Sequence, residues 1–82
     1  MPRRAFSGRQ VAKVLLQWGF EPVGGRGSHR LFRYENPDTE EVRTVTVPIT
    51  HDRIKIGTLR EIARQAGAMD FDAFCEELDR RL

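Results

Sequence analysis

A glycine-rich run, from Gly24 to Gly27, separates two short segments that have the composition of β-strands. Glycine reaches backbone conformations that other residues avoid, so such a run is typical of a sharp turn. Phe20 to Val23 precedes the run and predicts a short strand, which Pro22 confines to a sheet edge or a bulge. Ser28 to Glu35 follows it and predicts a second strand. The run therefore constrains the middle of the chain to a sheet.

A third strand is predicted from Val42 to Val47, where Val45 and Val47 share one face because side chains alternate along a strand. The segment from Asn36 to Thr39 is rich in residues that favour turns. We therefore expect the second and third strands to form an antiparallel hairpin.

Helices are predicted before and after this sheet region in the sequence. The first begins after Ser7, which makes a capping-box pattern with Gln10, and Gly19 is expected to end it. The second is expected to begin with Thr58 as its N-cap and with Glu61 completing another capping box.

A last helix is predicted after Asp70, because a capping residue there precedes apolar residues at helical spacing. The expected fold class is α+β: a helix, a three-stranded antiparallel sheet, a helix and an extra C-terminal helix. The helices are expected to cover one face of the sheet.

The chain has 82 residues, which predicts a single domain over residues 1–82. Apolar residues make up 39% and charged residues 32%, with no run near the roughly 18 apolar residues that cross a membrane. We therefore expect a cytoplasmic protein that does not enter a membrane. The single cysteine, Cys75, excludes an internal disulfide and is expected to be a buried apolar residue. Two histidines and one cysteine without ligand spacing predict no metal site, and no cofactor is expected.

The net charge is only +2, but the charges are unevenly distributed along the chain. Residues 1–34 hold seven basic side chains and one acidic, and residues 42–66 hold five basic and two acidic. The acidic residues gather in residues 35–41, which hold four, and in the last helix. Such segregation is typical of a nucleic-acid binder.

The tripeptide Gly27-Ser28-His29 places an ionisable imidazole, that of His29, at the expected start of the second strand. An imidazole can gain or lose a proton near neutral pH, and Arg26 and Arg30 beside it can hold a phosphate. This pattern indicates chemistry on a phosphodiester, with RNA as the candidate. A structural histidine that caps the strand is the alternative reading.

Further residues are predicted to contact RNA because they are basic or belong to the turn beside His29. Ser28 is expected to orient His29 or bind phosphate, although turn chemistry explains it equally well. His51 lies in a polar loop and either shares the acid–base work or is an exposed loop residue. The predicted RNA contacts are Arg26, Ser28, Arg30, Arg33, Arg43, Arg53 and Lys55.

Four segments in order resemble the HicA-type mRNA interferase toxins, whose fold is similar to a double-stranded-RNA-binding domain. The resemblance covers about Ser7 to Gly67, and the order and spacing of the segments carry it. They are Trp18-Gly19-Phe20, Gly27-Ser28-His29 with Leu31-Phe32, Val45-Thr46-Val47-Pro48, and Ile56-Gly57-Thr58-Leu59 through Ile62 to Gln65-Ala66-Gly67.

The resemblance implies a small metal-independent endoribonuclease that cleaves mRNA and is inhibited by a HicB-type antitoxin. It also implies that His29 is the catalytic histidine, acting as general acid or base on RNA, whose ribose 2′-OH is a built-in nucleophile. Two other classes stay open: a non-catalytic RNA-binding module of the same fold, and a protein-interaction domain that docks a partner on the last helix.

Overall fold

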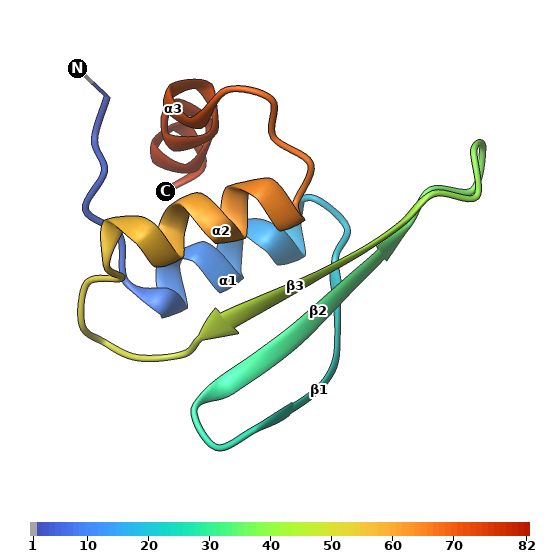
Figure 1. Cartoon of the computed structure of the whole chain (residues 1–82), viewed down its shortest axis with the longest axis horizontal. Coiled ribbons are helices and arrows are strands. Elements are labelled where there is room, and N and C mark those ends of the chain that lie inside the picture. Colours follow the sequence, from blue (N-terminus) through green and yellow to red (C-terminus); the bar gives the residue numbers. More distant parts are fainter. Residues whose placement is uncertain (1) are drawn as a thin grey trace.

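One face of a three-stranded antiparallel sheet is covered by helices, and the opposite face is open (Figure 1). The computed structural model describes residues 2–82. This architecture confirms the expected α+β fold class. The elements in chain order are α1 (Gly8–Gln17), β1 (Glu21–Arg26), β2 (His29–Glu35), β3 (Val42–Pro48), α2 (Ile56–Gln65) and α3 (Phe71–Arg81).

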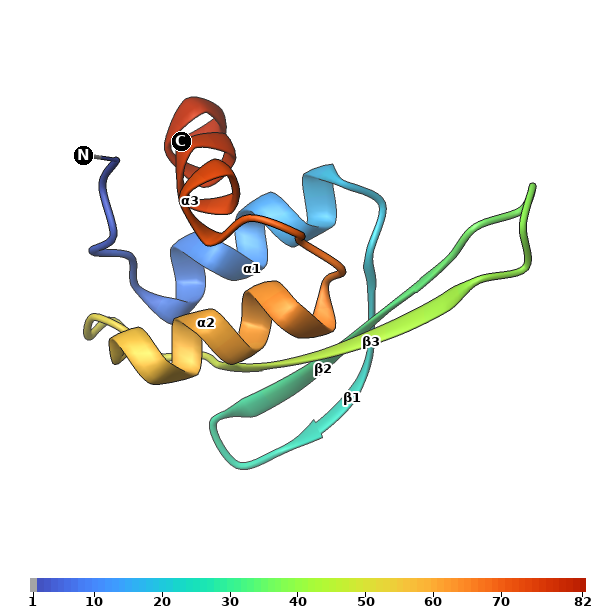
Figure 2. The same ribbon diagram turned by 45° about the horizontal axis from the view of Figure 1, so that its top comes forward.

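The helices form two layers above the sheet. Helices α1 and α2 lie next to the sheet, and α3 lies over them on the side away from the strands (Figure 2). None of the helices in residues 2–82 combines the length and the apolar character that crossing a membrane requires.

The predicted helix starts are confirmed for α1 and α3 and wrong for α2. The capping box of α1 is formed: the Gln10 N–H donates to Ser7 Oγ at 3.2 Å, and the Ser7 N–H donates to Gln10 Oε1 at 2.9 Å. The side chain of Asp70 caps α3 by accepting from the Asp72 N–H at 3.1 Å. These two caps satisfy N–H groups that a helix leaves unpaired at its start.

Helix α2 begins at Ile56 with Lys55 as its N-cap. The prediction that Thr58 is the N-cap is therefore wrong. The Leu59 N–H donates to the Lys55 carbonyl at 2.9 Å, which places Thr58 inside the first turn. Glu61 does not close a capping box, because its carboxylate accepts from the Arg64 guanidinium instead. Buried apolar residues fix the position of this helix, and tertiary packing overrides the local capping pattern.

The glycine-rich run lies inside β1 as far as Arg26 and only its last residue, Gly27, lies in a turn, which corrects the predicted end of this strand at Val23. The turn is the two-residue loop Gly27-Ser28, closed by the pairing of Arg26 with His29. Gly27 has φ 62°, and a positive φ at the first residue only is the pattern of a type II′ hairpin turn. All six residues of β1 are exposed, so pairing with β2 rather than burial holds this strand, and glycines are tolerated in it.

The expected hairpin of the second and third strands is confirmed. β2 pairs with β3 from His29 with Pro48 to Glu35 with Val42. The turn at its tip uses the Asn36 side chain, whose Oδ1 accepts from the Asp38 N–H at 2.9 Å. The acidic tip projects beyond the body of the molecule in both ribbon views (Figures 1 and 2). β1 also contains the bulge that Pro22 predicted, a register shift between Pro22 and Gly24.

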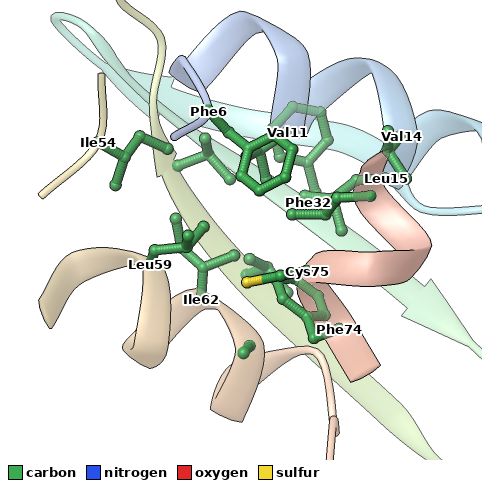
Figure 3. Close-up of a cluster of buried hydrophobic side chains, with 14 of the residues drawn as sticks. Phe6, Val11, Val14, Leu15, Phe32, Ile54, Leu59, Ile62, Phe74 and Cys75 are labelled. Atoms are coloured by element: carbon green, nitrogen blue, oxygen red, sulfur yellow. The ribbon is translucent and has the colours of Figure 1, made fainter. Parts of the chain in front are cut away.

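The core lies between the helices and the covered face of the sheet (Figure 3). Phe32, Val45 and Val47 face the helices from β2 and β3, and each is at most 4% exposed. Phe6 and Ile54, which precede α1 and α2, are also buried in this cluster. Burying a side chain of this size stabilises a protein by roughly 1.5–3 kcal/mol. The buried aromatic residues therefore pack the core rather than offering a stacking platform.

Candidate active site

His29 is exposed at the first position of the central strand β2. Its register partners are Arg26 on β1 and Pro48 on β3. Side chains alternate along a strand, so His29 lies on the face opposite the buried Phe32. The imidazole therefore belongs to the open face of the sheet.

The side chain of His29 lines a cleft of about 400 Å³ between the β2–β3 end of the sheet and α2. Strands β2 and β3, the loop after β3 and the length of α2 from Thr58 to Gln65 all contribute to its wall. The lining residues are His29, Thr46, Pro48, Thr50, Arg53, Ile54, Lys55, Thr58, Glu61 and Gln65. Polar groups, two cations and the carboxylate of Glu61 thus line one cleft together with the imidazole, as in a site for a polar ligand.

Two close backbone approaches fix the position of His29. The Ile49 N–H donates to the Ser28 carbonyl at 2.6 Å, which ties the β1–β2 turn to the end of β3. On the other side, a Cβ at Gly25 would lie 2.3 Å from the His29 carbonyl oxygen, and Gly25 has φ 152°. Only a residue without a side chain fits there, so the glycine-rich run lets β1 approach the candidate catalytic residue.

Gln65 holds α2 against the free edge of β3 on the far wall of the cleft. Its Oε1 accepts from the Thr46 N–H at 2.9 Å, a donor that no strand pairs. Its Nε2 donates to Glu61 Oε2 at 3.3 Å. The helix side chains therefore close the side of the cleft that the sheet leaves open.

Glu61 is held as a carboxylate in this wall. The Arg64 Nε and a terminal guanidinium nitrogen donate to its two oxygens at 2.8 and 2.5 Å. The hydrogen bond from Arg64, followed by the Coulomb attraction of that guanidinium, lowers the pKa of Glu61 below its usual value. The same pairing raises the pKa of Arg64. Glu61 is thus an ionised acceptor at neutral pH.

Two cationic side chains, Arg53 and Lys55, lie in the cleft wall with His29. The backbone of Arg53 forms an isolated bridge with Ser7, which fixes the loop that carries it. Lys55 stands at the N-cap of α2, where the helix dipole also favours an anion. The sequence placed both residues among the RNA contacts, and the structure brings both to His29.

The other predicted RNA contacts lie at different places on the sheet from Arg53 and Lys55. Arg26 shares the face of His29 as its register partner, while Arg30 alternates to the opposite face. Arg33 lies further along the open face, 3.2 Å from Glu35. Arg43 lies at the other end of the hairpin, where its Nε is 2.9 Å from Glu41. Adjacency in sequence therefore predicted more basic side chains around His29 than the structure places there, because neighbouring side chains of a strand point to opposite faces.

Several cleft residues escaped prediction because they come from elements far apart in the chain. Thr46, Thr58 and Gln65 reach His29 only through strand pairing and the docking of α2. Alternation on β3 placed Thr46 on the face away from the core, which is the one signal the sequence offered. His51 is exposed, and it does not belong to the described residues that line the cleft.

The remaining reactive groups offer no second centre. Burial raises the pKa of the Cys75 thiol, and its side chain is fully buried, as the sequence predicted. Across residues 2–82, no three His, Cys, Asp or Glu side chains gather in a group that could hold a metal ion. The cleft at His29 is therefore the candidate active site.

Residues 8–68 match the family model described as the HicA toxin of bacterial toxin-antitoxin. The matched segment begins with α1 and ends just after α2, so it contains the sheet, His29 and all the residues that line the cleft. Helix α3 and the residues before α1 lie outside it. No curated protein matches the chain.

Proposed function

Since this chain belongs to the HicA toxin family of bacterial toxin–antitoxin systems, we propose that it is an endoribonuclease that cleaves messenger RNA with His29 as general acid or base. As a toxin of this kind it has an antitoxin partner. The observation that supports the proposal most is the exposed imidazole of His29 in a cleft with Arg53 and Lys55. An imidazole and two cations are what phosphodiester cleavage without a metal needs.

The chemistry uses the ribose 2′-OH as nucleophile. His29 removes the 2′-OH proton or donates a proton to the leaving 5′-oxygen. The 2′-oxygen bonds to phosphorus as the bond from phosphorus to the 5′-oxygen breaks, which yields a 2′,3′-cyclic phosphate and a 5′-hydroxyl. Arg53 and Lys55 stabilise the charge that builds on the phosphate oxygens. Arg26, on the same face as His29, is proposed to bind a flanking phosphate.

The cations further from His29 have a smaller part in this proposal. Arg33 extends the open face on which the RNA would lie, and Ser28 positions His29 through the turn. Arg30 and Arg43 lie away from the cleft, so we assign them at most long-range attraction of RNA. We further propose that the partner is a HicB-type antitoxin that inhibits by covering the basic cleft with acidic groups.

The decisive experiment compares His29→Ala with His51→Ala. Positioned acid–base catalysis is worth about 10²–10⁴-fold, so His29→Ala should lower RNA cleavage by that factor with the fold intact by circular dichroism. His51→Ala should cleave like the wild type, because His51 lies in an exposed loop outside the cleft lining. Growth arrest on induced expression should follow the same pattern.

Two results would contradict the proposal. A folded His29→Ala variant that cleaves RNA at the wild-type rate would remove His29 from the chemistry. A wild-type chain that binds RNA without cleaving it would make the protein an RNA-binding module instead.

A further inference from the structure

A second basic cavity adjoins the cleft of His29 at the start of α2. It has a volume of about 640 Å³ and is lined by Arg4, Ala5, Arg53, Ile54, Lys55 and Ile56. We propose that this cavity binds a backbone phosphate of the RNA strand that flanks the bond cleaved at His29. This inference rests on the proposed ribonuclease function and extends it to a site formed partly by residues before α1.

The charge of the cavity selects an anion. Three of its lining residues are cationic: Arg4, Arg53 and Lys55. Within residues 2–82, no acidic residue lines this cavity. A phosphodiester carries one negative charge and oxygens that accept from guanidinium and ammonium groups.

The segment before α1 is attached to the loop before α2, and this attachment creates the cavity. The Ile54 N–H donates to the Phe6 carbonyl at 2.8 Å, and Ser7 forms a bridge with Arg53. Both ribbon views show these two segments side by side (Figures 1 and 2). Phe6 and Ile54 are buried in the core, which anchors the pairing. Arg4 is therefore held beside Lys55 by the fold.

The Arg4 guanidinium is held in place by two residues of α3. One terminal nitrogen lies 2.5 Å from Asp72 Oδ1, and the guanidinium carbon lies 5.5 Å from the centre of the Phe71 ring. Because 32% of the Arg4 side chain is exposed, a phosphate oxygen can reach the guanidinium from the cavity, in competition with the Asp72 carboxylate.

The cavity and the cleft form one track. They share Arg53, Ile54 and Lys55 as common wall, so Lys55 faces both. An RNA strand with its reacting phosphate at His29 can continue across Lys55 and bring a neighbouring phosphate to Arg4. Short RNA would then occupy the cleft alone, while longer RNA would also use Arg4.

The test measures binding of 2′-O-methyl RNA, which lacks the nucleophilic hydroxyl, to the full chain by fluorescence anisotropy. Two ligands are compared: a dinucleotide, and an oligonucleotide of about ten nucleotides. Arg4→Gln should weaken binding of the long ligand about tenfold, the usual effect of losing one charge-assisted contact. It should also lower the slope of log affinity against log salt by about 0.7. Binding of the dinucleotide should not change.

Asp72→Asn and Arg9→Gln complete the design. Asp72→Asn removes the competing carboxylate, so it should tighten binding of the long ligand, which a purely structural role of Arg4 would not produce. Arg9 is an exposed cation on α1 outside the lining of the cavity, and Arg9→Gln should leave both affinities unchanged.

The outcomes separate this inference from the proposed function. If His29→Ala abolishes cleavage but Arg4→Gln and Asp72→Asn bind long RNA like the wild type, the cavity proposal is wrong and the ribonuclease stands. If Arg4→Gln weakens only antitoxin binding, the cavity belongs to the antitoxin and the RNA proposal is again wrong. If the wild-type chain binds neither RNA, both proposals fail.

Discussion

His29 depends on a neighbouring glycine for its position. Gly25 lies opposite Arg30 in the β1–β2 ladder, and the His29 carbonyl would lie 2.3 Å from any Cβ there. A Cβ added at Gly24, the preceding residue, would meet no other described part of the chain within 4 Å. Two adjacent glycines in one strand therefore have opposite tolerance for a methyl group.

We expect Gly25→Ala to destabilise the protein by about 1–3 kcal/mol, because the added methyl overpacks the β1–β2 pair. It should also reduce RNA cleavage, since relief of the clash moves His29. Urea denaturation and a cleavage assay measure the two effects. Gly24→Ala is the matched control and should change neither. Equal stability of the two variants would argue against the close approach.

At the level of single residues, the sequence correctly predicted the caps Ser7 and Asp70 and the place of His29 at the start of a strand, whereas the catalytic role of His29 stays a prediction. It could not predict which cations share the face of His29, because that depends on strand register. Arg30 shows the difficulty: it is adjacent to His29 in sequence but alternates to the other face. Gln65 shows the converse, since it is 36 positions from His29 but lines the same cleft.

Among the elements, α2 has two contacts that determine the cleft. Its apolar side buries Leu59 and Ile62 in the core, and its polar side places Gln65 on the edge of β3. The sequence predicted the helix but put its start at Thr58, because capping patterns are local and the packing of Leu59 is not. The glycines of β1 misled in the same way, since pairing with β2 outweighs their poor strand propensity.

Gln65→Leu keeps the size of the side chain but removes the acceptor for the Thr46 N–H. An unsatisfied, partly buried donor costs roughly 1–3 kcal/mol, and we expect this loss of unfolding free energy in urea. Amide exchange at Thr46 should become faster at the same time. The control is Gln17→Leu, on an exposed part of α1, where the amide makes only a long contact of 3.4 Å. A Thr46 amide that exchanges equally in wild type and Gln65→Leu would refute the bond.

Over the whole molecule, one basic region and one acidic region lie at opposite ends of β2. The basic residues Arg53 and Lys55 lie near His29 at the start of β2, whereas the acidic hairpin tip begins where β2 ends. A strand of seven residues is about 20 Å long, so the two regions are well separated beyond the screening length of physiological salt. The nearly neutral net charge of +2 hides this division.

RNA affinity should therefore fall steeply as salt rises, although the net charge is small. Each phosphate contact contributes about 0.7 to the slope of log affinity against log salt for a single strand. Lys55→Gln should remove about one such contact. Lys13→Gln, which neutralises an exposed cation on α1, should leave the slope unchanged. A slope that responds equally to both substitutions would indicate diffuse attraction instead of a defined cleft.

The two edge strands of the sheet, β3 and β1, are both poorly suited to pairing with a further strand, for different reasons. Along β3, the amide of Gln65 occupies the Thr46 N–H. Along β1, a proline without an N–H and a bulge distort a strand of only six residues. Neither margin offers the long, regular ladder on which strands of another copy assemble. A long, regular sheet edge is a template for assembly between copies, and these features make both margins of this sheet poorer templates.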